Sequence, residues 1–210
     1  MKLTALLRDP PRPTITEDRD GLVVVLDDVL SPRECADLVE AGERVGFDGA
    51  PITVGPGKFV YHPEVRDNTR AMVDDPELAA ALWSRLQLVT PALVVPDWRP
   101  VGLNERLRWY RYQPGQAFRW HRDGSFARRD REERSFYTVL LYLTEGFDGG
   151  HTELSRQPPV VPRTGRALVF SHPLLHQGAP VREGTKYVLR TDLMFARAHA
   201  RSPPEAGETP

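Results

Sequence analysis

The spacing of apolar residues predicts an N-terminal part with two helices and a C-terminal part made of strands. Residues 21–26, Gly-Leu-Val-Val-Val-Leu, form an apolar, β-branched run that is typical of a buried strand. Apolar residues then recur at helical spacing in 35–45 and again in 78–86, where Arg85 interrupts the apolar face. The pattern therefore predicts one strand and two helices in this part.

Capping signals define where the two helices begin. Ser31, with Glu34 three residues later, is a capping-box arrangement and predicts a helix over 32–45. Asp75 caps a second predicted helix, from residue 76 to about 88. Each capping residue is followed by a proline, which is favoured at the first helical position.

From residue 103 onward the pattern changes to short, strand-like segments separated by turn residues. Two covering helices followed by serial strands predict an α+β fold in which N-terminal helices pack on an antiparallel sandwich or barrel. The segments are 105–112, 117–123, 137–143, 151–154, 166–171 and 186–195.

We expect a single domain over residues 21–196, with its β core at about 104–196. Residues 1–20 are charged and Pro-rich and predict a loose lead-in, whereas 197–210 predict a disordered tail. Residues 47–70 lack clean periodicity and contain several glycines, which favours a loop or mobile hairpin.

Composition excludes some classes of partner. The formal net charge of −1 gives no overall electrostatic case for binding nucleic acid or an anionic membrane. Cys35 is the only cysteine, so no intrachain disulfide forms, as is typical of a reducing compartment. No apolar run approaches the ~20 residues of a membrane span, and the N-terminus has too short an apolar stretch for a secretory signal. We therefore expect a cytoplasmic location.

The candidate chemistry begins in the stretch 118–123, Phe-Arg-Trp-His-Arg-Asp. In an extended strand, His121 and Asp123 point to the same side, because successive side chains alternate between faces. An imidazole and a carboxylate so placed can hold one metal ion as two of the three ligands in a facial triad of two histidines and one carboxylate. The tripeptide alone is weak evidence, so a third ligand is needed.

Two histidines compete to be the third ligand. His172 and His176 both follow the predicted strand at 166–171, and spacing alone does not separate them. Ten residues beyond His176 comes Lys186, which begins the last predicted strand and shares one strand face with Arg190. A cation there can pair with the far carboxylate of a 2-oxo acid bound to the metal.

Together these motifs resemble the 2-oxoglutarate and Fe(II)-dependent oxygenases, in particular the prolyl 4-hydroxylase-like branch. The resemblance covers roughly residues 104–195 and implies a double-stranded β-helix, or jelly roll, with iron at one end. Each motif alone is unspecific, and their order carries the resemblance. That order is Tyr112, His121-x-Asp123, Gly149-Gly150-x-Thr152, His176-x-Gly178 and Lys186.

The resemblance also implies roles for individual residues. It makes His121, Asp123 and His176 the iron ligands, because His176 matches the His-x-Gly pattern and His172 does not. It implies that Lys186 binds the distal carboxylate of 2-oxoglutarate, with Arg190 as an alternative clamp or a substrate contact. The pocket for this cosubstrate would be lined by Tyr112, Tyr142 and Thr152.

The expected function is a dioxygenase that uses Fe(II), 2-oxoglutarate and O2, with ascorbate as an optional further cofactor. It would hydroxylate an unactivated C–H bond and release succinate and CO2. Family halogenases have Gly or Ala at the carboxylate position, so Asp123 favours hydroxylation. Two alternatives remain open: a metal-binding jelly roll without turnover, acting as a sensor or scaffold, and a zinc hydrolase, which would need a nearby glutamate as general base.

The substrate follows less directly from the sequence. The branch acts on prolyl residues in peptides, and relatives act on amino acids and small metabolites, so peptide, amino-acid and small-molecule substrates are all candidates. Arg66 and Arg70 lie in the 47–70 segment and either pair with acidic residues on the surface or contact substrate. We favour a small or amino-acid-like substrate, whose carboxylate would be held by Arg66, Arg70 or Arg190.

Overall fold

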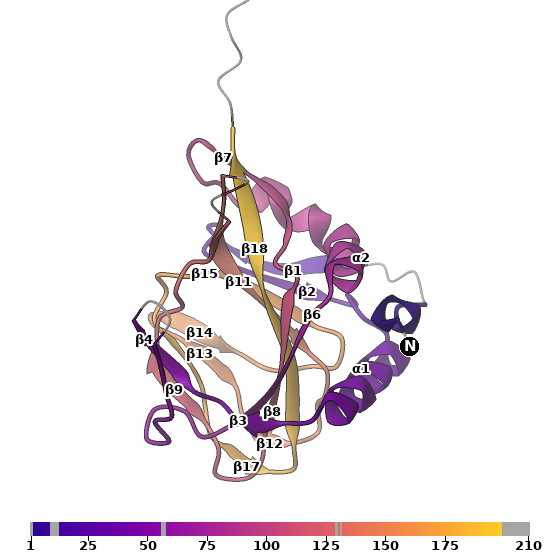
Figure 1. Ribbon diagram of the computed structural model, residues 1–210, viewed down its shortest axis with the longest axis vertical. Helices are drawn as coiled ribbons and strands as arrows, with labels where there is room; N and C mark the ends of the chain where they lie inside the picture. Colours follow the sequence, from indigo (N-terminus) through magenta and orange to yellow (C-terminus); the bar gives the residue numbers. More distant parts are fainter. Residues whose placement is uncertain (1, 9–12, 56–57, 129, 131, 199–210) are drawn as a thin grey trace, which may run out of the picture.

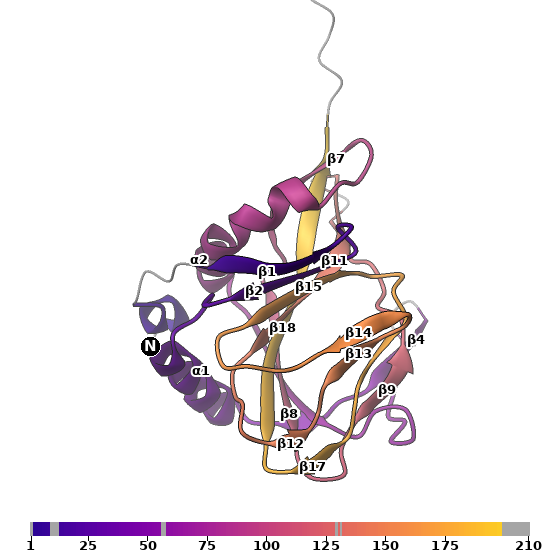
Figure 2. The same cartoon turned by 180° about the vertical axis from the view of Figure 1, so that it is seen from behind.

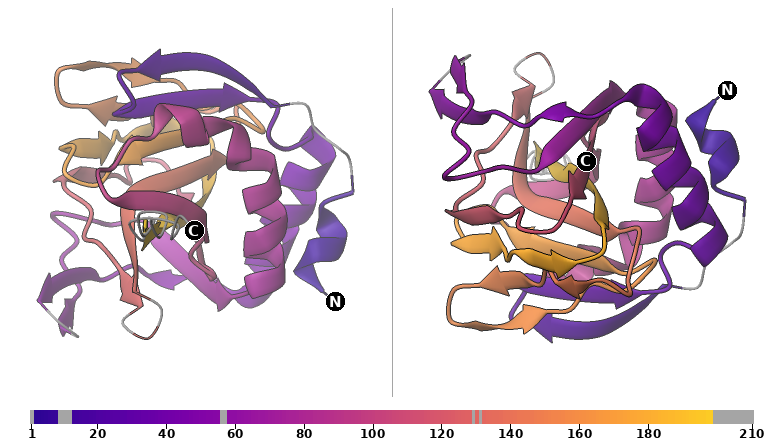
Figure 3. Two further views of the ribbon diagram at one scale, coloured as in Figure 1. Left: turned by 90° about the horizontal axis from the view of Figure 1, so that it is seen from above. Right: turned by 90° about the horizontal axis from the view of Figure 1, so that it is seen from below.

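The computed structural model describes residues 2–8, 13–55, 58–128, 130 and 132–198. Two helices, a large antiparallel sheet and a smaller antiparallel sheet form three successive layers (Figure 1, Figure 2). The end-on views in Figure 3 show both helices on the same side of the large sheet. The mostly-β architecture with helices on one face agrees with the fold class expected from the sequence.

The large sheet contains ten strands, and β18 lies near its centre (Figure 1). Its strand order is β1 (Thr14–Arg19), β2 (Val23–Asp27), β15 (Ala167–Ser171), β11 (Glu133–Tyr142), β18 (Lys186–Arg197), β8 (Arg106–Tyr112), β6 (Thr69–Asp74) and β3 (Asp48–Gly49). Two further strands join it, β10 (Ala127–Arg128) beside β11 and β7 (Trp98–Leu103) beside β18.

The smaller sheet has four strands, in the order β14 (Gln157–Val160), β13 (Thr152–Leu154), β16 (His176–Gly178) and β9 (Phe118–His121). Two ribbons of two strands complete the β structure. They are β12 (Asp148–Gly149) with β17 (Val181–Glu183), and β4 (Ile52–Gly55) with β5 (Lys58–Val60).

The helices begin where their capping signals predict. In α1 (Pro32–Val45), the Ser31 hydroxyl accepts from the Glu34 N–H and the Glu34 carboxylate accepts from the Ser31 N–H, which completes the capping box. In α2 (Pro76–Leu86), Asp75 accepts from a backbone N–H of the first turn. Short 3-10 helices lie at Leu3–Leu6 (η1) and, directly after α2, at Gln87–Ala92 (η2). No described helix is long and apolar enough to cross a membrane.

Strand alternation gives the large sheet two different faces. On β18, Leu189 and Leu193 pack in the core between the sheet and the helices, whereas Val188 packs in the core shared with the smaller sheet. The indole N–H of Trp109 on β8 donates to the Leu38 carbonyl of α1 at 2.9 Å, which fixes helix against sheet. The second core lies beside the candidate site.

The structure corrects several expectations. The lead-in predicted for 1–20 contains β1, which pairs along β2 and has mostly exposed side chains, so no apolar alternation marked it. Within 47–70, predicted as a loop or mobile hairpin, β4 and β5 form an antiparallel pair as the hairpin alternative expects, but β3 instead joins the large sheet by pairing with β6. Strands β6 and β7 were also missed, and the strand predicted for 117–123 ends at His121. The predicted tail at 197–210 lies, from residue 199, outside the described residues.

Candidate metal and cosubstrate site

Pairing of β9 with β16 brings the two candidate histidine ligands together. His121 lies directly opposite His176 in the register of the smaller sheet, and their ring centroids are 4.2 Å apart. Residues directly opposite each other in an antiparallel pair share one face. Positions that are 55 residues apart in the chain thus become neighbours through a single strand pairing.

Asp123 completes a group of three ligand atoms. Its carboxylate oxygens lie 3.8 Å from Nε2 of His121 and 3.7 Å from Nε2 of His176. One ligand atom from each residue falls within 4.8 Å of the other two, a spacing that fits one ion at their centre. Although β9 ends at His121, Asp123 in the irregular segment that follows lies within ligand distance of the histidine.

The histidine rings are oriented for metal binding. Nδ1 of His121 lies 2.7 Å from the carbonyl oxygen of Arg119, and Nδ1 of His176 lies 2.9 Å from that of Leu174. With the proton on Nδ1 donated to the carbonyl, the lone pair of each Nε2 faces Asp123. The donor set of two neutral imidazoles and one carboxylate fits Fe(II) with open coordination positions.

Burial and charge set the protonation states that this donor set needs. Burial lowers the pKa of His121 to about 4 and also lowers the pKa of His176. Burial alone would raise the pKa of Asp123, but Arg190 and the two histidines hold it well below its usual range. The histidines are therefore neutral and the carboxylate is ionised near neutral pH, so no proton competes with a metal ion.

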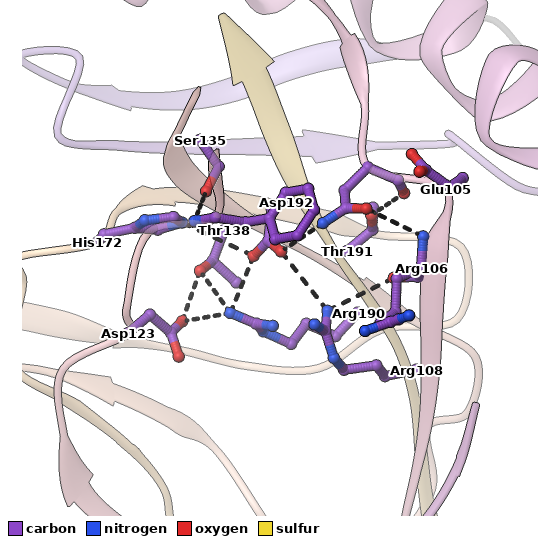
Figure 4. A network of polar contacts seen from close by, with 12 residues as sticks. Glu105, Arg106, Arg108, Asp123, Ser135, Thr138, His172, Arg190, Thr191 and Asp192 are labelled. Atoms are coloured by element: carbon purple, nitrogen blue, oxygen red, sulfur yellow. Dashed lines mark hydrogen bonds and ion pairs between the residues drawn. The ribbon is translucent and has the colours of Figure 1, made fainter. Parts of the chain in front are cut away.

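A buried polar network holds the Asp123 carboxylate from behind (Figure 4). The Thr138 hydroxyl and the Arg190 guanidinium both contact its Oδ2, the latter at 3.2 Å. Arg190 also lies 3.0 Å from the carboxylate of Asp192, which in turn accepts a hydrogen bond from the Asn104 side chain. Outer contacts of this kind orient a ligand and tune its affinity for metal.

His172 belongs to this network and not to the ligand group. Its Nε2 lies 3.7 Å from Oδ1 of Asp192, and burial lowers its pKa. His172 lies near Thr138 in this network (Figure 4). The geometry therefore groups His176, not His172, with His121 and Asp123.

A pocket opens beside the three ligands between the large and the small sheet. Its walls contain every residue that the sequence assigned to metal or cosubstrate except Tyr142, which lies just behind. The lining residues are Tyr110, Tyr112, Phe118, His121, Asp123, Leu140, Thr152, His176, Gly178, Lys186, Val188 and Arg190.

Lys186 is a buried cation at one end of this pocket. Its ammonium donates to the Gly150 carbonyl at 2.6 Å and lies 5.1 Å and 5.7 Å from the ring centroids of Tyr112 and Tyr142. Burial lowers the pKa of Lys186 to about 7. No carboxylate of the described residues pairs with it. An incoming anion would therefore find a cation that is not already neutralised.

The residues around Lys186 explain the Gly-Gly-x-Thr motif. Gly149 has a positive φ of 77°, and an added Cβ would lie 2.3 Å from the Pro180 carbonyl oxygen, so only glycine fits. Gly150, also with positive φ, supplies the carbonyl that holds the lysine. The hydroxyls of Thr152 and Tyr142 are 2.7 Å apart, which holds the tyrosine against a residue of the pocket wall.

Sequence reasoning missed Tyr110 and Thr138, and it placed Asp192 on the strand face of Lys186 and Arg190 without giving it a role. Tyr110 precedes Tyr112 by two positions on β8 and so shares its face, a signal that strand alternation could have given. Thr138 and Asp192 come from different strands that pair in register. The contact of Thr138 with Asp123 carries no local sequence signal, whereas Arg190 and Asp192 share a face of β18 by strand alternation.

Comparisons with known proteins agree with this site. The model of the 2OG-Fe(II) oxygenase superfamily matches residues 107–191, which hold all three candidate ligands and Lys186. A putative prolyl 4-hydroxylase of Acanthamoeba polyphaga mimivirus is 33% identical, over 42% of this chain and 44% of its own length. The matched region thus spans under half of that relative.

Two solved structures share the fold. The viral collagen prolyl hydroxylase of Paramecium Bursaria Chlorella virus-1, in its 2OG complex, aligns with a TM-score of 0.57 at 20% identity, over 83% of this chain and 96% of its own. A prolyl hydroxylase of Trichoplax adhaerens, in complex with a hypoxia inducible factor oxygen degradation domain peptide fragment, aligns with a TM-score of 0.61 at 16% identity. The alignment covers 82% of this chain and 83% of that one.

These findings confirm the resemblance to the 2-oxoglutarate and Fe(II)-dependent oxygenases, prolyl 4-hydroxylase-like branch. The cofactors expected from that resemblance, Fe(II) and 2-oxoglutarate, agree both with the family description and with the His-Asp-His group.

Proposed function

We propose that this chain is an Fe(II)- and 2-oxoglutarate-dependent dioxygenase that hydroxylates a C–H bond of an amino-acid-like, peptidyl or small-metabolite substrate. Its core would be a double-stranded β-helix formed by the two facing sheets. The observation that carries the proposal is the placement of a three-residue ligand group and an unneutralised buried lysine in the walls of one pocket. A site that bound metal alone would have no use for the lysine.

The ligands leave room for the reactants. His121, Asp123 and His176 would occupy one face of the metal, so that three positions of a six-coordinate ion remain for the cosubstrate and oxygen. Bound Fe(II) would supply the redox chemistry, in which substrate R–H, O2 and 2-oxoglutarate give R–OH, succinate and CO2. The carboxylate of Asp123 would be held in place by Thr138 and Arg190.

Lys186 is the better candidate for the distal carboxylate of 2-oxoglutarate. Arg190 already contacts the carboxylates of Asp123 and Asp192, whereas Lys186 has only a neutral carbonyl as its hydrogen-bond acceptor. The ammonium would pair with the incoming carboxylate between the rings of Tyr112 and Tyr142. The aromatic walls would exclude water around this pair and strengthen it.

The alternative functions fit the pocket less well. A zinc hydrolase needs a general base, and the described residues that line the pocket include no glutamate. A scaffold without turnover is compatible with the ligand group but does not explain Lys186.

The direct test is cosubstrate binding followed by turnover. Calorimetric titration of the Mn(II)-loaded protein with 2-oxoglutarate should show one site per chain, and the Fe(II) protein should release succinate during a screen of peptides, free amino acids and acidic metabolites. Absence of 2-oxoglutarate binding would favour the scaffold. Hydrolytic activity that persists without oxygen in the Zn(II) protein would instead identify a hydrolase.

A further inference from the structure

Two arginines beside the pocket, Arg66 and Arg70, form no ion pair with a carboxylate of the described residues. Arg66 is only 4% exposed, and its guanidinium carbon lies 4.3 Å from the ring centroid of Tyr110 and 4.4 Å from that of Phe118. Both rings line the pocket, and Phe118 stacks on the ligand His121 with 3.5 Å between ring centroids. The ring of Phe118 therefore lies between Arg66 and the candidate ligand His121.

Arg70 reaches the same place from strand β6. It lies directly opposite Tyr110 in the pairing of β6 with β8, and so shares the face that Tyr110 presents to the pocket. Arg70 is half-buried. Burial lowers its pKa, and the charges of Arg66, Arg108 and Arg190 lower it further. Tyr110 raises the pKa of Arg70, and the nearby arginines and burial act against it.

The two carboxylates that contact Arg190 are already paired, whereas Asp48, directly opposite Arg70 in the pairing of β3 with β6, is exposed. Asp123 and Asp192 both contact Arg190, and Asp192 also lies 3.5 Å from Arg108. Arg66 has one side-chain hydrogen bond, from its Nε to the amide oxygen of Asn68, and its buried Nη2 has no acceptor. No described carboxylate forms an ion pair with Arg66 or Arg70.

Three other arginines in the described part of the chain, buried or partly buried, do form ion pairs with carboxylates. On the opposite face of β8, Arg111 is partly buried and pairs with Glu43 at 3.1 Å. Arg85 and Arg166, both largely buried, each pair with a carboxylate. Because an uncompensated buried charge is costly, one buried and one half-buried guanidinium beside the pocket favour a negatively charged ligand.

We propose that Arg66 and Arg70 form a carboxylate-binding subsite for the substrate, so that the enzyme acts on small carboxylic acids such as free amino acids and not on internal residues of a peptide. This inference rests on the proposed function and specifies its substrate class. The subsite and the cosubstrate clamp lie on opposite sides of β8, since Arg70 pairs across from Tyr110 on β6 and Lys186 across from Tyr112 on β18. Two anions could therefore bind without competing for one cation.

The test compares acids with their amides. The full-length protein, loaded with Mn(II) and saturating 2-oxoglutarate, is titrated with a panel of free L-amino acids and with the corresponding C-terminal amides. We expect at least one acid to bind at least about tenfold more tightly than its amide, which is the scale of a charge-assisted hydrogen bond. The difference should shrink to under about threefold in Arg70→Met and in Arg66→Met.

The controls separate the possible failures. Arg111→Met removes a guanidinium from the other face of the same strand and should keep the full preference for the acid. Because Arg66 packs between two rings, its variant can lose stability, and Arg70→Met then carries the test, with 2-oxoglutarate affinity as the measure of an intact pocket. Equal binding of acids and amides, tight binding of a peptide blocked at both ends, or no binding by any acid would overturn the subsite. Failure to bind 2-oxoglutarate would instead overturn the proposed function.

Discussion

An Nη nitrogen of Arg190 lies 3.2 Å from Oδ2 of Asp123 and 3.0 Å from Oδ1 of Asp192. One guanidinium thereby joins a candidate metal ligand to a carboxylate buried deeper in the core (Figure 4). This contact separates the roles of the two cations on β18: Arg190 supports the metal ligand, and Lys186 remains available to the cosubstrate.

Replacement of Arg190 by methionine should weaken metal binding. The change keeps an apolar stem but leaves the Asp123 carboxylate with Thr138 as its main hydrogen-bond donor. We expect the affinity for Mn(II), measured by calorimetry, to fall about 10- to 100-fold, the range typical of residues that orient a metal ligand. At saturating Mn(II), the affinity for 2-oxoglutarate should change little. If 2-oxoglutarate affinity fell while Mn(II) affinity stayed normal, Arg190 and not Lys186 would be the clamp.

Replacement of Lys186 by methionine should have the opposite effect. Loss of the ammonium removes the partner of the distal carboxylate, so 2-oxoglutarate affinity should fall about 10- to 100-fold while Mn(II) affinity is kept. Lys186→Arg preserves the charge and should recover part of the affinity, as far as the larger guanidinium fits. Equal 2-oxoglutarate affinity in the wild type and Lys186→Met would show that the lysine has only a structural role.

The pKa of Lys186 predicts a pH dependence of cosubstrate binding. In the free protein burial lowers this pKa to about 7, and the groups that surround the ammonium, the Gly150 carbonyl and the rings of Tyr112 and Tyr142, are neutral. Binding of an anion requires the protonated form, so above pH 7 affinity should fall by up to about tenfold per pH unit. Lys186→Arg stays charged and should flatten the profile. A wild-type profile parallel to that of Lys186→Arg would exclude this assignment.

The lowered pKa of Lys186 also predicts how the free energy of unfolding depends on pH. Between pH 7 and 10.5 the unfolded chain keeps the Lys186 proton that the folded chain has lost, so the free energy of unfolding should rise with pH in this window. Urea titrations at several pH values would measure it. Lys186→Met removes this contribution, so its stability should increase less with pH than that of the wild type.

Removal of a ligand should abolish activity without unfolding the chain. Because Asp123 and His121 lie at the pocket wall, outside the two apolar cores, Asp123→Ala and His121→Ala should keep the wild-type circular dichroism spectrum. Both should lose succinate release and high-affinity metal binding. His172→Ala is the matched control, and it should retain Mn(II) binding. If His172→Ala lost Mn(II) binding, His172 would have to be considered a metal ligand.

The arginine that interrupts the apolar face of α2 has a structural role. Arg85 forms two bonds with Glu34 of α1, at 2.8 and 2.9 Å, and Glu34 is buried. Arg85→Met should lower the free energy of unfolding by about 3–5 kcal/mol, because the buried Glu34 carboxylate loses the guanidinium that neutralises its charge. The affinity of the remaining folded protein for 2-oxoglutarate should be unchanged. A stability change under about 1 kcal/mol would indicate a merely surface pair.

Local patterns in the sequence were enough for the parts of the molecule that depend on near neighbours. The capping box at Ser31 and Glu34 and the alternation of Lys186 and Arg190 on β18 involve residues within a few positions of each other. The order of short motifs also identified His121, Asp123 and His176, because family resemblance supplies long-range information that local chemistry does not. Most helices and core strands were predicted for these reasons.

Only the tertiary structure decided what depends on pairing between distant strands. The sequence left Arg190 as a possible cosubstrate clamp, and its contacts with Asp123 and Asp192 favour Lys186 instead. It missed β1 and β6, whose side chains lack a clear apolar alternation and whose backbones are ordered by neighbouring strands. The sequence also left open whether Arg66 forms a surface ion pair or contacts substrate. Burial of a charge is a property of what surrounds it, and that is set by residues far away in the chain.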